Sequence, residues 1–170
     1  PGDDFLARVA MEWESATEPA RQAGIRVVNL RIGFVLSAAG GGLPKLLLPF
    51  RLGLGGVVGS GRQYMSWIAF DDLIGAIYHA MFAEGLSGPV NAVASTPATS
   101  AELSKTLGRV LRRPVVMPLP AFAVRLAAGE MGEALLLSGQ RVLPARLEKS
   151  GFRFLHADLE GALRGELGLA

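Results

Sequence analysis

The side chains that could do acid–base, nucleophilic or metal chemistry are few in this sequence. Cysteine is absent, so the chain has no thiol for a disulfide, a thiolate metal site or a cysteine nucleophile. The imidazoles are those of His79 and His156, which stand far apart along the chain. Two separate histidines without cysteine partners argue against a metal site and against a Ser-His-Asp triad. The sequence therefore predicts no metal and leaves the catalytic acid and base unknown.

The adjacent carboxylates Asp71 and Asp72 and the glycine-rich segment 37–62 are two further candidates for chemistry. Neighbouring residues on a helix point in different directions, so the carboxylates are predicted to cap a helix rather than to act as a pair. The four glycines between 53 and 59 lack the spacing of a dinucleotide fingerprint, because position i+5 is Val58, and no Gly-Lys-Ser/Thr follows them. We interpret them as loop residues that permit a positive φ.

The composition places these residues in one folded domain with a core of its own. The chain has 170 residues, half of them apolar, and a formal net charge of +2 from 17 basic and 15 acidic side chains. The arginines are scattered, with no basic run longer than Arg112-Arg113, which argues against a nucleic-acid partner. No stretch reaches about 18 uninterrupted apolar residues, so no membrane span is predicted. The lack of cysteine and of a signal peptide's basic start favours a cytoplasmic protein.

The first part of the chain predicts a helix and then a buried strand. The helix runs to about Ala16 behind the candidate N-caps Asp3 and Asp4. Its buried stripe, at helical spacing, is predicted to consist of Phe5, Val9 and Trp13. Gly24 ends the helical stretch, as a glycine after a helix does. Residues 25–36 are almost continuously apolar, which is typical of a strand buried on both faces in an α/β layer.

The middle of the chain predicts shorter elements. Residues 57–68 are predicted to form a small hairpin, and a helix capped by Asp71 follows it. Residues 90–94 are predicted to form a short strand. Thr99 and Glu102 have the spacing of a capping box at the start of a strongly amphipathic helix.

The tail has a different pattern from the rest of the chain. Residues 115–117 predict a last strand, after which glycines separate short helical patterns at about 121–128, 132–138, 144–150 and 158–167. We therefore predict an α/β fold in two parts. Residues 1–117 form the main domain, and residues 118–170 form a small helical C-terminal module.

Four blocks of the sequence resemble one known family. They read LRIGFVLSAAGGGLPKLLLPFRLGLGG, GSGRQYMSWIAFDDLIGAI, GPVNAVA and, in the tail, LPAFAVRLAAGEMGEALLLSGQRVLPARLEKSGFRF. In this order they resemble the extended short-chain dehydrogenase/reductase superfamily. More narrowly they resemble the YfcH-like epimerase family proteins, described as NAD(P)-dependent nucleoside-diphosphate-sugar epimerases. The tail resembles that group's C-terminal module of unknown function. The resemblance runs from about residue 4 to residue 167.

The resemblance implies that this chain corresponds to the C-terminal half of a Rossmann-like parallel sheet with the helical module attached. The family begins with a Rossmann half that carries a glycine fingerprint, and this chain begins after it. The superfamily's catalytic Tyr-x-x-x-Lys is also missing, because the fourth residue after Tyr64 is Ile68 and the fourth after Tyr78 is Phe82. This departure puts proton transfer by a phenol-lysine couple in doubt.

The function that the resemblance implies is an NAD(P)-dependent epimerase or oxidoreductase acting on a nucleotide-sugar-like small molecule. NAD or NADP would carry out the hydride exchange. The competing hypothesis is a non-catalytic truncated piece, or a binding and interaction module. Its partner would be a second copy of the chain or the missing N-terminal half.

The resemblance also implies which residues face the ligands. Ligands approach the carboxyl ends of parallel strands, and there it places the cofactor-binding residues Arg31, Gly33, Phe34 and Val35. On the substrate side it places Lys45, Arg62, Gln63 and Trp67. An arginine suits a diphosphate because its guanidinium can grip the group through two parallel hydrogen bonds. The plain alternative is a core strand and turn for the first set, and solvated cations with a core-covering tryptophan for the second.

Overall fold

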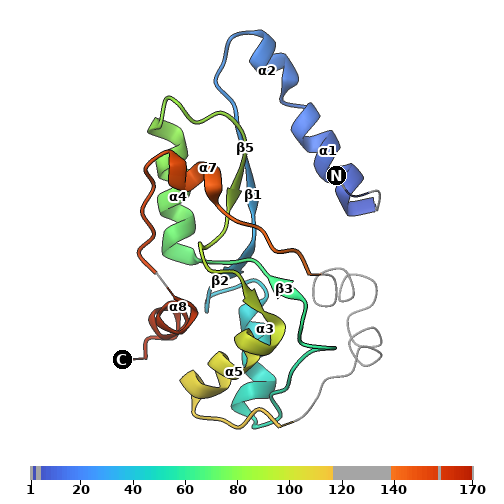
Figure 1. The fold of residues 1–170 in the computed structure, drawn as a ribbon, viewed down its shortest axis with the longest axis vertical. Coiled ribbons are helices and arrows are strands. Elements are labelled where there is room, and N and C mark those ends of the chain that lie inside the picture. Colours follow the sequence, from blue (N-terminus) through green and yellow to red (C-terminus); the bar gives the residue numbers. More distant parts are fainter. Residues whose placement is uncertain (1, 3–4, 117–138, 157, 170) are drawn as a thin grey trace.

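The fold comes from a computed structural model that describes residues 2, 5–116, 139–156 and 158–169 (Figure 1). Helices and strands alternate along it, which confirms the mixed α/β class. The order is α1 (Phe5–Ser15), α2 (Glu18–Gln22), β1 (Val28–Ile32), β2 (Phe34–Leu36), α3 (Leu43–Arg51), β3 (Tyr64–Met65), β4 (Trp67–Ala69), α4 (Phe70–Phe82), β5 (Gly88–Ala92), β6 (Ala98–Thr99), α5 (Ser100–Leu111), α7 (Ala145–Lys149) and α8 (Leu159–Glu166). The predicted helices over 121–128 and 132–138 lie outside the described residues.

Two of the three strand pairs are parallel. β1 pairs with β5 in the register Val28 to Gly88, and β2 pairs with β4 in the register Phe34 to Trp67. The third pair, β3 with β6, is antiparallel, with Tyr64 opposite Thr99. The predicted hairpin over 57–68 is therefore wrong. Residues 64–65 and 67–69 pair with different strands that are distant in sequence, because the chain changes partners at the residue between them.

The predicted strand over 25–36 is divided at Gly33 into β1 and β2. Leu36 at its end is fully buried, but Ile32 is 51% exposed, so burial on both faces is wrong for β1. The reason is that, within the part of the chain that the structure describes, β5 is the only strand paired with β1. The other edge of β1 is uncovered there.

The core has two main clusters, and the tail contributes to both. One cluster surrounds Trp67 and contains Leu47 of α3, Leu107 of α5 and Leu163 of α8. The other contains Leu147 of α7, which packs against β5 and α4. The helices α7 and α8, drawn in orange and red in Figure 1, thus bury their apolar side chains against the sheet-bearing part of the chain.

Helix α1 projects from the rest of the molecule beside β1 (Figure 1). Its predicted buried stripe is wrong, because Phe5 is 69% exposed and Trp13 is 75% exposed. The spacing of these residues does produce an amphipathic helix, as expected. None of its residues is fully buried, and Val9 of the stripe is partly buried.

The helix ends test several local predictions. The Thr99 hydroxyl accepts a hydrogen bond from the Glu102 amide and the Glu102 carboxylate accepts one from the Thr99 amide, so the capping box is confirmed. The prediction that Gly24 ends the helical stretch is confirmed, because Gly24 follows α2 with a left-handed φ of 79°. The predicted Asp71 cap is wrong, because α4 begins one residue earlier and Ala69 occupies the N-cap position without a side-chain hydrogen bond. The predicted strand over 115–117 is wrong for residues 115–116, which are irregular.

Candidate functional site

The strand ends meet at Gly33, where the chain passes from β1 to β2. The Gly33 amide donates to the Ala92 carbonyl oxygen at 3.1 Å, and the Phe34 amide donates to the Ser66 carbonyl oxygen at 2.8 Å. A Cβ at position 33 would overlap the Ser66 carbonyl oxygen and lie 2.7 Å from Cγ1 of Val93. Glycine is therefore required here by the close approach of neighbouring backbone. We call this place, where the chain passes from β1 to β2 at Gly33, the crossing. It brings the carboxyl ends of β1 and β5 beside β2 and β4.

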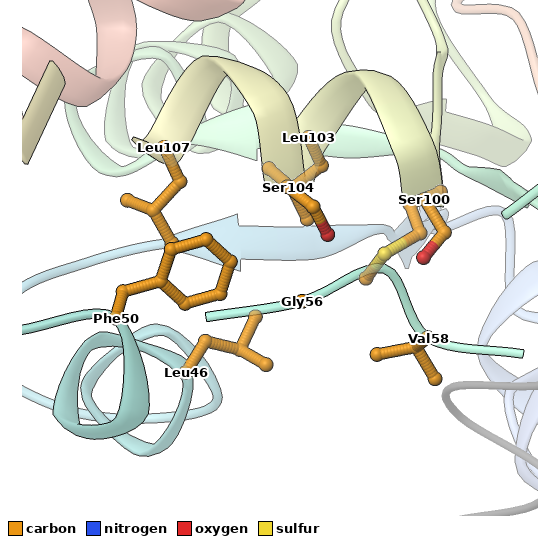
Figure 2. A pocket seen from close by; sticks show the side chains of 9 residues that line it. Leu46, Phe50, Gly56, Val58, Ser100, Leu103, Ser104 and Leu107 are labelled. Atoms are coloured by element: carbon orange, nitrogen blue, oxygen red, sulfur yellow. The ribbon is translucent and has the colours of Figure 1, made fainter. Parts of the chain in front are cut away.

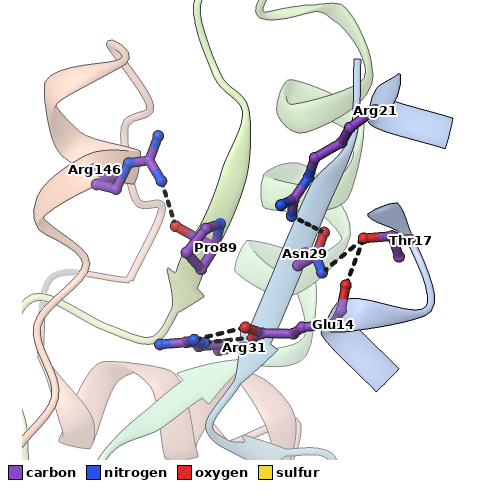
Figure 3. Close-up of polar contacts among 7 residues, drawn as sticks. All are labelled: Glu14, Thr17, Arg21, Asn29, Arg31, Pro89 and Arg146. Atoms are coloured by element: carbon purple, nitrogen blue, oxygen red, sulfur yellow. Dashed lines mark hydrogen bonds and ion pairs between the residues drawn. The ribbon is translucent and has the colours of Figure 1, made fainter. Parts of the chain in front are cut away.

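Arg31 lies two residues before Gly33 and forms an ion pair with Glu14 of α1 (Figure 3). Its Nε is 2.6 Å from Oε1 and its Nη2 is 2.7 Å from Oε2, so the guanidinium grips the carboxylate with two bonds. The hydrogen bond with Arg31 lowers the pKa of Glu14, and the same bond raises the pKa of Arg31. This ion pair attaches α1 to the sheet edge, and the predicted cofactor contact of Arg31 stays a prediction.

The other two residues predicted to bind the cofactor lie in the packed part of the crossing. Phe34 is partly buried against the Trp67 cluster, and its ring covers Gly42, where a Cβ would overlap it. Val35 is partly buried against the cluster of Ile68, Leu73 and Ala92. Their contact with a cofactor stays a prediction.

Two of the residues predicted on the substrate side make internal hydrogen bonds. Trp67 is 1% exposed, and its indole Nε1 donates to the Thr96 carbonyl oxygen at 2.8 Å. Gln63 donates from Nε2 to the Val58 carbonyl oxygen at 2.9 Å and accepts from the Ser60 hydroxyl at 3.3 Å. Gln63 therefore fastens the turn that precedes β3, and Trp67 fills the core behind it.

The two predicted cations, Lys45 and Arg62, are exposed. Lys45 stands on helix α3 rather than in a loop. Arg62 lies just before β3, and only its backbone amide contacts the Ser60 hydroxyl, at 3.3 Å. Among the residues that the structure describes, no carboxylate pairs with either cation. Both are therefore available to an anionic ligand.

A small apolar pocket lies between α3, the segment 56–58 and α5 (Figure 2). Its volume is about 20 Å³, which is room for about one water molecule. The hydroxyl-bearing residues Ser100 and Ser104 border it on the α5 side. The remaining lining residues are Leu46, Phe50, Gly56, Val58, Met65, Leu103 and Leu107. This pocket is too small for a sugar or a nucleobase, and we assign it no ligand.

Asp72 has a role that was not predicted from the sequence. Its side chain is 1% exposed, with Oδ1 accepting from the Leu155 amide at 2.6 Å and Oδ2 accepting from the His156 amide at 3.2 Å. The carboxylate therefore ties the tail to the first turn of α4. The only hint in the sequence was that two adjacent aspartates stand at the start of a helix, although one aspartate is enough to cap it.

The sequence analysis also missed the contact of the tail with the turn between β3 and β4. The Ser66 hydroxyl donates to the Gln140 carbonyl oxygen at 2.8 Å and accepts from the Val142 amide at 2.9 Å. A Cβ at Gly139 would lie 2.5 Å from the Tyr64 amide nitrogen. Residues 139–142 therefore lie directly against the segment that carries the predicted substrate-binding residues.

Metal clusters and membrane-spanning helices are both absent from the described residues. In residues 5–116 and in the described residues of the tail, no three His, Cys, Asp or Glu side chains gather in a way that could hold a metal ion. In the same part of the chain, no helix is both long and apolar enough to cross a membrane.

Several known proteins are similar to this chain in sequence or in fold. Residues 119–165 match the model of a family described as a domain of unknown function (DUF1731). Epimerase family protein Mb2239 of Mycobacterium bovis is 48% identical over 162 residues, which are 95% of this chain and 54% of that protein. The chain thus spans about half the length of the curated relatives it matches.

Two solved structures share both fold and sequence with this chain. Human epimerase family protein SDR39U1 (isoform 2), crystallised with NADPH, is 40% identical with a TM-score of 0.81, over 85% of this chain and 49% of that one. The nucleoside-diphosphate sugar epimerase from Corynebacterium glutamicum is 40% identical with a TM-score of 0.80, over 98% of this chain and 32% of that one. In sequence and in fold, this chain is therefore similar to part of proteins that are named as epimerases.

Proposed function

We propose that this chain forms part of an NAD(P)-dependent epimerase or oxidoreductase of the extended short-chain type, acting on a nucleotide-sugar-like substrate. The main support is the relative with NADPH, which is 40% identical and matches the fold with a TM-score of 0.81. The crossing at Gly33 adds a structural reason, because ligands of α/β sheets bind outside the carboxyl ends of the strands.

The residues present fit one end of the cofactor. At the crossing, Gly33 lets the backbone of neighbouring strands approach closely, and Arg31, paired with Glu14, places a cation at the exposed sheet edge. A glycine fingerprint that would hold the pyrophosphate is absent from the sequence. We therefore assign the nicotinamide end to this chain, with Phe34 and Val35 supporting it from the core side. The cofactor supplies the hydride exchange when it is bound.

On the substrate side the proposal divides the four residues into two kinds. Lys45 and Arg62 are exposed cations that suit the phosphates of a sugar nucleotide. Gln63 and Trp67 are positioning residues, because one fastens the turn before β3 and the other fills the core beneath it. Because residues 139–142 contact this turn, the tail forms part of the same proposed substrate-binding surface.

The proposal includes a partner surface on α1 and β1. Phe5, Trp13 and Ile32 leave large apolar side chains in solvent, and β1 has an unpaired edge in the described part of the chain. Unpaired strand edges and apolar patches of this kind are usually covered. We propose that the N-terminal half of a full-length protein, or a second copy of the chain, covers this surface. The proposal that a partner covers this surface is contradicted if sedimentation shows a well-folded monomer and a dye-binding assay shows no exposed apolar surface.

A cofactor titration tests the proposed function. The full-length protein and the 170-residue chain are titrated side by side with NADH and NADPH by calorimetry. The full-length protein is expected to bind one of the two, whereas the chain alone binds neither measurably, because its sequence lacks the glycine turn that holds the pyrophosphate. Micromolar binding of NADH or NADPH by the 170-residue chain would overturn the proposal that this chain holds the nicotinamide end of the cofactor and lacks the pyrophosphate site. Failure of the full-length protein to bind either cofactor would overturn the function itself.

A further inference from the structure

A second charged feature lies at the C-terminal end of α5, in the lower part of Figure 1. An open hollow of about 490 Å³ is bordered there by four cations, together with Gly108, Pro114 and Val115. The four cations are Lys105, Arg109, Arg112 and Arg113, and all of them are exposed. None of them belongs to the site proposed above.

The backbone builds this hollow by folding back at the end of the helix. The Arg113 amide donates to the Gly108 carbonyl oxygen at 2.8 Å, and a Cβ at position 108 would overlap Cγ2 of Val115 and lie 2.9 Å from the Arg113 carbonyl oxygen. Glycine at 108 is therefore needed for residues 113–115 to pack on the last turn. Arg112 makes the turn with a left-handed φ of 52°, a conformation in which glycine is the usual residue.

Four of the chain's basic side chains lie together around this hollow. The chain as a whole has 17 basic and 15 acidic side chains. Four of these 17 basic side chains thus border one hollow. The sequence showed only the pair Arg112-Arg113, because the other two cations join it through the geometry of the helix.

Little of this charge is neutralised within the molecule. Arg109 lies 3.3 Å from Oε2 of Glu160, a carboxylate that also pairs with Arg164. The pKa of Glu102 is lowered by its hydrogen bonds with Thr99 and, to a smaller extent, by the charge of Lys105. Among the described residues, no carboxylate pairs with Arg112 or Arg113. The partial negative charge at a helix C-terminus favours cations in the last turn, which accounts for Arg109. It does not account for Arg112 and Arg113, which follow the helix.

We propose that this hollow binds a small molecule that carries a di- or polyphosphate group. Guanidinium groups grip phosphate oxygens in pairs, and three of the four cations here are arginines. The volume of about 490 Å³ is in the range of small-molecule sites. Among the described residues that line the hollow, none is aromatic and could stack on a base, so single-stranded nucleic acid is a poorer fit. The site depends on the charge and shape of the α5 end and is independent of the proposed function.

Titration with inorganic pyrophosphate tests the proposal on the 170-residue chain. Calorimetry is expected to show saturable binding of one pyrophosphate per chain, weaker at higher salt. The double variant Arg112→Gln/Arg113→Gln is expected to bind at least about tenfold more weakly, because it removes two forked donors. The matched control Lys149→Gln/Arg153→Gln removes the same charge from exposed positions in and just after α7 and is expected to bind within about twofold of the parent, because α7 packs against β5 and not against α5.

Arg112→Gly is a second variant that keeps the backbone, because glycine accepts the left-handed conformation without strain. Circular dichroism and the melting curve check that every variant stays folded. Absence of saturable binding overturns the proposal. Equal loss of binding in the Arg112→Gln/Arg113→Gln variant and in its control also overturns it, since it shows diffuse charge attraction rather than a site. Binding to DNA that pyrophosphate does not compete away overturns it in favour of a nucleic-acid surface.

Discussion

Replacement of Asp72 by alanine tests how strongly the tail is attached to the rest of the chain. The Asp72 carboxylate is 1% exposed and accepts two backbone hydrogen bonds, from the Leu155 amide at 2.6 Å and the His156 amide at 3.2 Å. Alanine removes both acceptors and leaves the two amides without a partner. The neighbouring tail helices α7 and α8 both bury leucines in the core. Loss of this attachment therefore weakens the packing between two helices and the sheet.

The magnitude follows from the number and type of bonds. A hydrogen bond to a charged group contributes about 1.5–3 kcal/mol. The 2.6 Å bond lies in the strong range and the 3.2 Å bond is weaker, and the Leu155 side chain is 76% exposed, so water can reach this segment when it detaches. We expect Asp72→Ala to lower the free energy of unfolding by about 2–4 kcal/mol. For a domain of this size that corresponds to a fall in melting temperature of roughly 4–16 °C.

Thermal melts and native-state hydrogen exchange measure this effect. The Leu155 and His156 amides are expected to exchange faster in Asp72→Ala than in the parent chain. Asp71→Ala is the matched control, because Asp71 is the adjacent residue of the same type and is exposed in the first turn of α4. Its carboxylate interacts with the helix dipole alone, at about 0.3–1 kcal/mol. Equal melting temperatures for the two variants, with unchanged exchange at both amides, would refute the reasoning.

Three further predictions concern the crossing and the exposed cations. Gly33→Ala is expected to lower the free energy of urea unfolding by about 1–3 kcal/mol, because its Cβ overlaps neighbouring backbone; Gly40→Ala, where a Cβ meets open space, should change it by less than about 0.5 kcal/mol. The exposed ion pair of Glu14 with Arg31 is expected to contribute about 0.2–1 kcal/mol. Because folding lowers the pKa of Glu14 below 4.5, this contribution is present above about pH 4.5 and is lost as the pH falls through the lowered value, so the stability difference from Glu14→Gln should vanish in acid. In the full-length protein, Arg62→Ala should weaken nucleotide-sugar binding by roughly ten- to a hundredfold while NAD(P) affinity and melting temperature stay nearly constant; a large fall in melting temperature would show a structural role instead.

Features set by a few neighbouring residues were predicted well from the sequence. The capping box of Thr99 and Glu102 and the helix end at Gly24 depend on residues within one or two helical turns. The helices α4, α5, α7 and α8 lie where their apolar periodicity predicted them, to within a few residues. In each case the information needed for the prediction lies within the segment itself.

Features that depend on distant partners were predicted poorly. The segment 57–68 has the alternation of a hairpin, but its strands pair with β2 and β6, which lie far away in the sequence. The stripe on α1 has the spacing of a buried helix face, yet Trp13 is 75% exposed, because burial needs a surface that the described chain does not provide. Periodicity states which face of an element is apolar, but it does not state what lies against that face.

The polar residues show the same division between local and distant information. Gln63 and Trp67 were predicted as ligand contacts because the family resemblance places them on the substrate side, but in the structure their polar atoms bond to the carbonyl oxygens of Val58 and Thr96. Asp72 was chosen as a cap, although it bonds to a segment more than eighty residues away. A polar side chain inside a fold first satisfies the backbone groups that have left water, because an unpaired buried group is costly. The side chains left for ligands are then the exposed ones that no internal partner uses. In the described part of this chain, they include the cations Lys45 and Arg62 on the substrate side and Lys105, Arg112 and Arg113 at the end of α5.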